Sequence, residues 1–288
     1  MAQNKGNLAA IAFMTLGMAA TASVDAVIKG ATSQAVPAQI VTVVGFGLTA
    51  IFSFVLFLRR EPLLTRTMVH PAVVARTVFE VVGSFGTVLA LSLVSLSLVT
   101  AIGQTVPIFA TIGAIIVFRE RTSPSVWLAL AGGLIGMMLI VRPGVSGFDP
   151  GILVAVLAAI GLAARDLASR AAPKQVSTPQ LGVIGGLAIG CSGIVVILAS
   201  PEPVADLTLS MALSCVAIIA FAASAFFFIT TAMRMGDVSV VSPFRYSRLV
   251  FGFAYGVLFF GDEIELNTII GVALIVVSGI VLLRREFK

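Results

Sequence analysis

The chain has little of what a soluble enzyme uses for chemistry. Its 288 residues include one histidine, two cysteines and one tryptophan, and charged residues make up only 11%. A soluble domain carries about 25% charged residues, and no polar stretch in this chain is long enough to form one. An enzyme centre needs a metal cluster, a nucleophile with a base, or paired carboxylates, so we expect no catalytic, metal or cofactor site.

The few reactive side chains stand alone in the sequence. Cys191 and Cys215 both lie inside apolar runs, where we expect buried thiols and neither a disulfide nor metal ligands. The single histidine, His70, precedes Pro71 at an expected helix start. The phosphate-binding pattern GxxxxGK followed by Ser or Thr does not occur, so this chain is not expected to use ATP.

Apolar residues are abundant instead. They make up 59% of the chain, and the mean hydropathy is +1.12. A helix needs about 20 apolar residues to span a bilayer, and ten segments approach that length. They predict an all-α polytopic membrane protein with spans at residues 8–28, 37–58, 69–91, 96–118, 124–141, 150–169, 179–199, 209–233, 238–260 and 266–283.

Basic residues lie mostly on one side of this arrangement. The termini and the even-numbered loops hold twelve of the 18 lysines and arginines, the opposite loops hold Lys29 and Arg142, and four lie inside helices. The positive-inside rule therefore places both termini in the cytoplasm and the protein in the inner membrane. Short loops account for the net charge of +5, and no nucleic-acid partner is expected.

The end of each half carries the same pattern. An acidic turn joins two apolar segments, with Glu120 in the first half and Glu263 in the second. Gly136 follows Glu120 by 16 residues, and Gly279 follows Glu263 by 16. Each glutamate is expected to accept hydrogen bonds from the free N–H groups of the helix that follows it. Repetition of this kind in an apolar chain is typical of transporters.

The beginning of each half repeats as well. Asp25 precedes Lys29 by four residues and Asp166 precedes Arg170 by four. Residues four apart lie on one helix face, so each acid can meet its base. We interpret Asp25 with Lys29 and Asp166 with Arg170 as gate or interface pairs.

Five spans in each half is an odd number, so the halves of a repeat must be inserted with opposite orientation. This predicts one membrane domain in which inverted repeats at residues 1–145 and 146–288 surround a central cavity. Close helix contact is expected along glycine faces such as Gly132, Gly133 and Gly136.

These features together resemble the drug/metabolite transporter superfamily, in particular its ten-helix EamA type. The motifs that carry the resemblance are Arg119-Glu120-Arg121 with Gly136, Gly261-Asp262-Glu263 with Gly279, and Pro243-Phe244-Arg245-Tyr246. The resemblance implies a secondary transporter of small metabolites, similar to bacterial exporters of aromatic and other neutral amino acids. An arginine often found early in the second helix of the family is absent from residues 37–48.

Ionisable residues inside the spans mark a candidate site, because each costs about 2.5–3.5 kcal/mol to insert. Arg76 and Glu80 lie one turn apart on the third span. They form either a structural pair or part of the cavity, where Glu80 binds a substrate amine or carries a proton. Arg165, next to Asp166, is expected to extend to the membrane surface.

Polar residues near two prolines complete the candidate set. Gln104 lies deep in the fourth span, as an interhelical hydrogen-bond partner or a substrate ligand, and Pro107 is expected to kink or hinge that helix. Arg245 and Arg248 start the ninth span after Pro243, with Tyr246 beside them. They either anchor the helix at the membrane surface or, for the two arginines, bind a substrate carboxylate.

Three classes of function compete for such a chain. The repeats favour a secondary transporter of amino acids, with nucleosides, organic acids or drugs as alternative substrates. A lone histidine disfavours an intramembrane enzyme, and the lack of a filter-like loop disfavours a channel. The expected partners are the small-molecule substrate and the lipid bilayer. The sequence sets no oligomeric state, and a monomer suffices.

Overall fold

The computed structural model describes residues 2–31, 37–63, 65–93, 102–141, 150–199, 208–260 and 266–286, and it is helical throughout these ranges apart from short connections. The long helices are α1 (Ala2–Ala31), α2 (Pro37–Arg59), α3 (Pro71–Leu93), α5 (Val106–Phe118), α6 (Pro124–Val141), α7 (Pro150–Ala171), α8 (Thr178–Ala199), α9 (Leu209–Met235), α11 (Ser247–Phe260) and α12 (Leu266–Glu286). Three short elements accompany them, namely the 3-10 helices η1 (Arg66–Val69) and η2 (Ser242–Tyr246) and the single turn α10 (Val238–Val241).

Proline and threonine set several of the helix starts. Pro37, Pro124 and Pro150 are the first residues of α2, α6 and α7. A proline costs nothing at a position where the N–H has no intrahelical partner. The Thr208 hydroxyl caps α9 by accepting a hydrogen bond from the Met211 amide, with an O–N distance of 3.3 Å.

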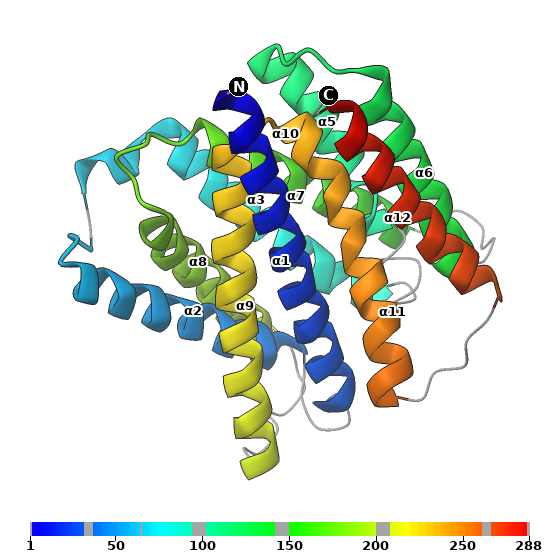
Figure 1. Ribbon diagram of the computed structural model, residues 1–288. Coiled ribbons are helices and arrows are strands. Elements are labelled where there is room, and N and C mark those ends of the chain that lie inside the picture. Colours follow the sequence, from blue (N-terminus) through cyan, green and yellow to red (C-terminus); the bar gives the residue numbers. More distant parts are fainter. Residues whose placement is uncertain are drawn as a thin grey trace.

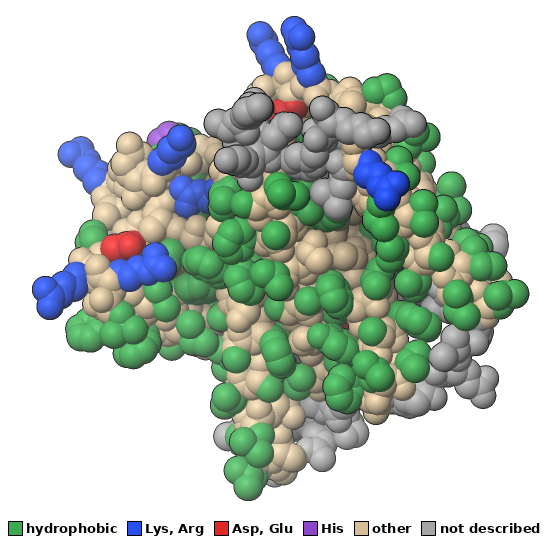
Figure 2. Space-filling view, viewed as in Figure 1, with side chains coloured by type: hydrophobic (Ala, Val, Ile, Leu, Met, Phe, Trp, Pro, Cys, Tyr) green, Lys and Arg blue, Asp and Glu red, His purple; other side chains and the backbone are tan. Residues whose placement is uncertain are grey.

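The outside of the bundle is apolar. Within the described residues, five helices are long and apolar enough to cross a membrane, and α5, α6 and α12 contain shorter apolar stretches. Every long helix exposes large apolar side chains, and the space-filling view shows them spread over the face in sight (Figure 2). A surface of this composition faces lipid, so the chain is a multi-pass membrane protein.

The helices pair across the two halves in a symmetric way. The most extensive contacts join α2 with α8, α6 with α12, α3 with α7 and α1 with α9. The first two pairs unite the same helix of each half, and the other two exchange when the halves are exchanged. Such a pattern is expected of two five-helix repeats related by a two-fold axis.

Glycines allow the closest of these contacts. A Cβ atom at Gly45 of α2 would lie 2.2 Å from the Gly190 nitrogen of α8. A Cβ atom at Gly136 of α6 would lie 2.7 Å from the Gly271 carbonyl of α12. Backbone cannot give way cheaply at such distances, so the predicted small-residue contacts are confirmed.

The fourth and ninth spans are broken, where the sequence predicted continuous helices. In the fourth, residues 94–101 lie outside the described ranges, a turn follows at Gln104, and α5 begins at Val106. In the ninth, η2 separates α10 from α11, which begins at Ser247. Val106 and Ser247 are 141 residues apart, the same separation as Asp25 and Asp166. The breaks therefore fall at equivalent places in the two halves.

Both chain termini lie at one end of the bundle, called the terminal end below (Figure 1). On the face in view, lysine and arginine side chains gather at the upper and left-hand edges, and the lower part carries none among its described residues (Figure 2).

Candidate functional site

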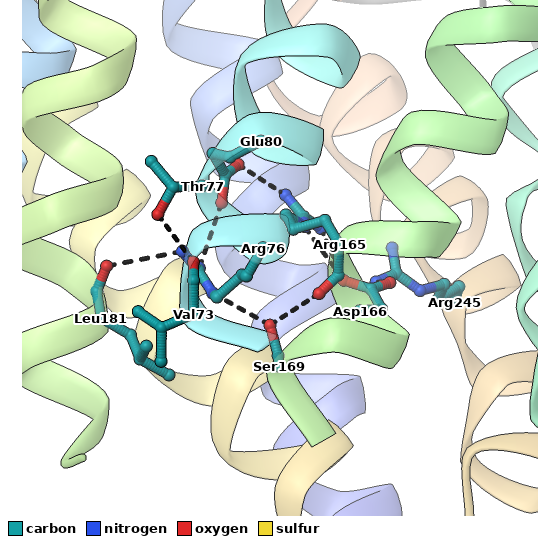
Figure 3. A network of polar contacts seen from close by, with 9 residues as sticks. All are labelled: Val73, Arg76, Thr77, Glu80, Arg165, Asp166, Ser169, Leu181 and Arg245. Atoms are coloured by element: carbon teal, nitrogen blue, oxygen red, sulfur yellow. Dashed lines mark hydrogen bonds and ion pairs between the residues drawn. The ribbon is translucent and has the colours of Figure 1, made fainter. Parts of the chain in front are cut away.

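Five charged side chains meet inside the bundle, and we call them the buried charge cluster: Arg76, Glu80, Arg165, Asp166 and Arg245 (Figure 3). Arg76 Nη2 lies 3.1 Å from Glu80 Oε2, and Arg165 Nη1 lies 2.9 Å from Glu80 Oε1. Arg165 also contacts Asp166 at 2.9 Å, and Arg245 binds the second Asp166 oxygen. The cluster thus joins α3, α7 and η2.

Arg76 is the most enclosed member of the cluster. Its side chain is 1% exposed. Its Nε donates to the Ser169 hydroxyl at 3.0 Å, and its guanidinium lies over the Phe226 ring at 4.8 Å. A Cβ atom at Gly185 would lie 3.0 Å from Arg76 Nη1, so the glycine makes room for this charge. Removing one partner of a buried ion pair costs about 3–5 kcal/mol, so this cluster resists opening.

A second group of polar residues, the terminal cluster, lies near the terminal end: Asn7, Glu120, Arg170 and Asp237. Arg170 Nη2 lies 3.3 Å from Glu120 and 3.1 Å from Asp237. The Asp237 amide donates to the Asn7 side chain at 2.9 Å, and the Asn7 amide donates back to the Asp237 carboxylate at 3.1 Å. This cluster connects α1, α7, the turn after α5 and the turn before α10.

Glu120 acts as a cap, although for a different helix from the one expected. Its carboxylate accepts the backbone amides of Val238 and Ser239 at 3.2 and 3.0 Å, together with the Ser239 hydroxyl. The expectation that it would cap α6 is therefore wrong. These amides belong to the first turn of α10, so a carboxylate of the first half satisfies free N–H groups in the second.

Asp25 of α1 and Arg248 of α11 form a third ion pair, which is accessible. Arg248 Nε and Nη2 each donate to one Asp25 oxygen at 2.8 Å, in a two-pronged arrangement. The side chains are 48% and 38% exposed, respectively. The hydroxyls of Ser23 and Tyr255 lie 3.0 Å apart between the same two helices. An exposed ion pair contributes only about 0.2–1 kcal/mol to stability.

The expected pairing of Asp166 with Arg170 is wrong. Asp166 points to Arg165 and Arg245, and Arg170 points to the terminal cluster. A helix face shared by two charges does not decide their partners when other helices offer better geometry. For the expected pair of Asp25 with Lys29, the Lys29 side chain lies outside the described residues.

Two further expectations are corrected. Arg165 does not extend to the membrane surface, because its side chain is 16% exposed and holds Glu80 and Asp166 within the bundle. Cys215 is buried as expected, whereas Cys191 is exposed on α8. Both thiols are free.

The remaining candidates gather around the helix breaks. Gln104 is buried in the turn before α5, and Pro107 is the second residue of that helix. The Pro107 carbonyl accepts a hydrogen bond from the Ser242 hydroxyl of η2 at 3.4 Å, so the two breaks contact each other. Tyr246 is 1% exposed, and its hydroxyl has no hydrogen-bond partner among the residues that the structure describes. Its ring packs on Gly133, where a Cβ atom would lie 2.2 Å away.

The structure thus joins Arg76, Glu80 and Arg245 in one cluster. Tyr246 follows Arg245 in η2, and Gln104 lies at the other break, which contacts η2 through Pro107 and Ser242. Sequence reasoning did not identify Asn7 and Asp237 as partners, and it did not pair Arg248 with Asp25. Arg248 carried a signal, since a charge ten residues inside an apolar span needs a partner.

Comparisons with known proteins agree with this architecture. The sequence profile of the EamA-like transporter family matches residues 8–142 and 149–284. A riboflavin transporter of Rhizobium johnstonii is 28% identical over 84% of this chain and 80% of its own. An S-adenosylmethionine uptake transporter of Rickettsia prowazekii is 23% identical over 84% and 81%. A crystal structure aligns with a TM-score of 0.78 over 97% of this chain and 98% of its own, at 20% identity, which shows a shared fold.

Proposed function

Because this chain belongs to the EamA-like transporter family and so moves a small molecule, we propose that its substrate carries an α-amino-acid group. Neutral and aromatic amino acids are the first candidates, exported across the inner membrane from a cytoplasm that contains both termini. This amino-acid specificity is the one expected from the sequence, and the counterflow experiment below tests it.

The observation that carries this proposal is the presence of charges of both signs inside an apolar bundle. An α-amino acid is a zwitterion, and its ammonium and carboxylate need an acid and a base close together. Glu80 offers an acid and Arg76 and Arg245 offer bases, beside the helix breaks. Gln104 and Tyr246 supply neutral polar groups, and we propose that these five residues border a central cavity.

The relatives supply both support and a rival. S-adenosylmethionine contains the α-amino-acid group of methionine, so one group of relatives is named for a substrate of the proposed class. Riboflavin has no such group, and the riboflavin transporter makes riboflavin the second candidate. The S-adenosylmethionine relatives are named for uptake, so uptake is the competing direction.

Alternating access is the mechanism that we propose. Two inverted repeats, residues 1–145 and 146–288, rock about a site at the helix breaks. The buried charge cluster and the terminal cluster then close the terminal end, while Asp25, Lys29, Asp166 and Arg170 belong to the gates. Pro107 serves as a hinge, because it is the second residue of α5 and lies directly after the break at Gln104, where the helical hydrogen bonds are interrupted. A monomer is sufficient for this cycle.

Counterflow in proteoliposomes tests the proposal. Vesicles loaded with unlabelled phenylalanine, threonine or methionine should accumulate the labelled form in a saturable manner, which also distinguishes a carrier from a channel. Labelled S-adenosylmethionine and riboflavin are run in parallel. Accumulation of riboflavin alone, or of no compound with an α-amino-acid group, would overturn the assignment.

A further inference from the structure

We infer that Asp25 and Arg248 form an accessible recognition site for the α-amino-acid group, with Asp25 receiving the ammonium and Arg248 the carboxylate. The inference rests on the transport function proposed above and names residues that read the charge of the substrate. It adds an accessible site to the buried charge cluster, which is closed in this state of the protein.

The Asp25–Arg248 pair has the geometry that a bound α-amino-acid group requires. Arg248 presents Nε and Nη2 as a fork, and both donate at 2.8 Å to a carboxylate. A substrate carboxylate has the same shape as the Asp25 side chain and can occupy the same fork. The side chain of Asp25, once released, accepts from an ammonium group. The substrate carboxylate thus takes the place of Asp25 on Arg248, and the substrate ammonium takes the place of Arg248 on Asp25. The zwitterion adds no net charge to the site.

The pair lies far from the terminal end of the bundle. Asn7 is at the terminal end, and Asp25 follows it by 18 residues on the continuous helix α1, which is about 27 Å along the helix axis. The hydrocarbon core is about 30 Å thick, so Asp25 and its partner Arg248 lie toward the end opposite the termini. Charged groups are costly to expose to hydrocarbon, and these side chains are 48% and 38% exposed. The pair therefore faces water that enters from that end.

The buried charge cluster and the Asp25–Arg248 pair differ in the free energy that opening them costs. Opening the buried charge cluster leaves Arg76, whose side chain is 1% exposed, without its acid in a dry environment. Opening the Asp25–Arg248 pair leaves two charges that water already reaches, so this exchange is much less costly. An incoming zwitterion can thus displace the accessible pair first, and it reaches the buried charge cluster only after that cluster has opened.

The neighbouring groups fit a zwitterion as well. The hydroxyls of Ser23 and Tyr255 lie 3.0 Å apart beside the pair, on the same two helices. They add hydrogen-bonding groups without adding charge. The Tyr255 ring packs against Phe259 in a tilted arrangement, with 5.9 Å between centroids, and offers an apolar edge to a neutral side chain.

The test is competition against labelled phenylalanine in the counterflow assay. For the wild type, unlabelled phenylalanine should inhibit at least tenfold better than phenethylamine, which lacks the carboxylate, and 3-phenylpropionate, which lacks the ammonium. Arg248→Gln should raise the KM for phenylalanine at least tenfold and abolish the preference over phenethylamine. Asp25→Asn should abolish the preference over 3-phenylpropionate.

The chain offers a matched control in another accessible pair. Arg59 lies 4.0 Å from Glu61 at the end of α2, with side chains 52% and 33% exposed. Arg59→Gln should leave the KM and the analogue preferences unchanged. Wild-type flux with unaltered preferences in both Asp25→Asn and Arg248→Gln overturns this inference alone. Wild-type protein that carries no amino acid overturns the proposed function with it.

Discussion

Asp25 and Asp166 hold equivalent positions in the first helix of each half, yet their surroundings differ. The Asp25 side chain is 48% exposed and pairs with Arg248. The Asp166 side chain is 3% exposed and lies between Arg165 and Arg245. The bundle is thus closed by ion pairs around Asp166 and is accessible around the equivalent Asp25. In alternating access one end of the transporter is closed while the other is open, and the two ends change roles in the next state.

Glu80→Gln should reduce phenylalanine counterflow at least tenfold and lower the melting temperature. The variant leaves Arg76 without its acid partner, a change that costs about 3–5 kcal/mol in a buried pair. The double variant Arg76→Met with Glu80→Met removes both charges, and its melting temperature should return close to that of the wild type while transport stays low. Wild-type transport rates in a well-folded Glu80→Gln variant would show that the buried charge cluster has no role in transport.

Tyr246→Phe should leave the protein as stable as the wild type, or raise its stability. In the described part of the chain the buried hydroxyl has no hydrogen-bond partner, and such a group costs about 1–3 kcal/mol. An increase in KM without loss of stability would therefore identify substrate contact. Gly133→Ala provides the comparison, because its Cβ atom would lie 2.2 Å from the ring and should lower stability and transport together.

Gly45→Ala should destabilise the protein by about 1–3 kcal/mol, since its Cβ atom would lie 2.2 Å from the Gly190 backbone. Gly252→Ala is the matched control in α11, where a Cβ atom meets nothing within 4 Å. That substitution should stabilise the helix by about 0.5–1 kcal/mol. Thermal unfolding in detergent, followed by the fluorescence of Trp127, measures both. Equal shifts would contradict the close approach of α2 and α8.

Arg170→Gln should loosen the terminal end. It removes the links from α7 to Glu120 and Asp237, at 3.3 and 3.1 Å. We expect a cysteine introduced at the fully buried Val241 to react faster with a membrane-impermeant maleimide in this variant, once both native cysteines have been replaced. Arg119→Gln, which changes an exposed arginine one residue before Glu120, should leave the labelling rate as it was. If the cysteine at position 241 is labelled no faster in Arg170→Gln, the terminal cluster does not take part in gating.

Hydropathy and proline positions were sufficient to predict most of the helices. Apolar length decides whether a segment spans a bilayer, and a proline at the first position leaves a helix intact, as at Pro37 and Pro150. The breaks at Gln104 and in η2 were not predicted as breaks. Pro107 suggested a kink, but a proline alone does not distinguish a bend from an interruption when neighbouring groups can satisfy the free backbone.

Charge partners were harder to predict than charge positions. The sequence marked Arg76, Glu80 and Asp166 because each is costly inside a span. It paired Asp166 with Arg170 by spacing along one helix, whereas the structure pairs it with Arg245, which is 79 residues away. Glu120 likewise caps a helix of the other half. Contacts between helices depend on how the halves dock, and periodicity within one helix carries no information on that.

The bond between Asn7 and Asp237 has a practical side for anyone purifying this protein. Asn7 lies only six residues after the first residue and exchanges two hydrogen bonds with the turn before α10. An affinity tag fused to the amino terminus would sit beside this contact and compete for it. A tag after α12 lies at the same end of the bundle but leaves both residues of the contact and the segment before Asn7 unchanged. Transport should therefore be lower with the amino-terminal tag than with the carboxyl-terminal one.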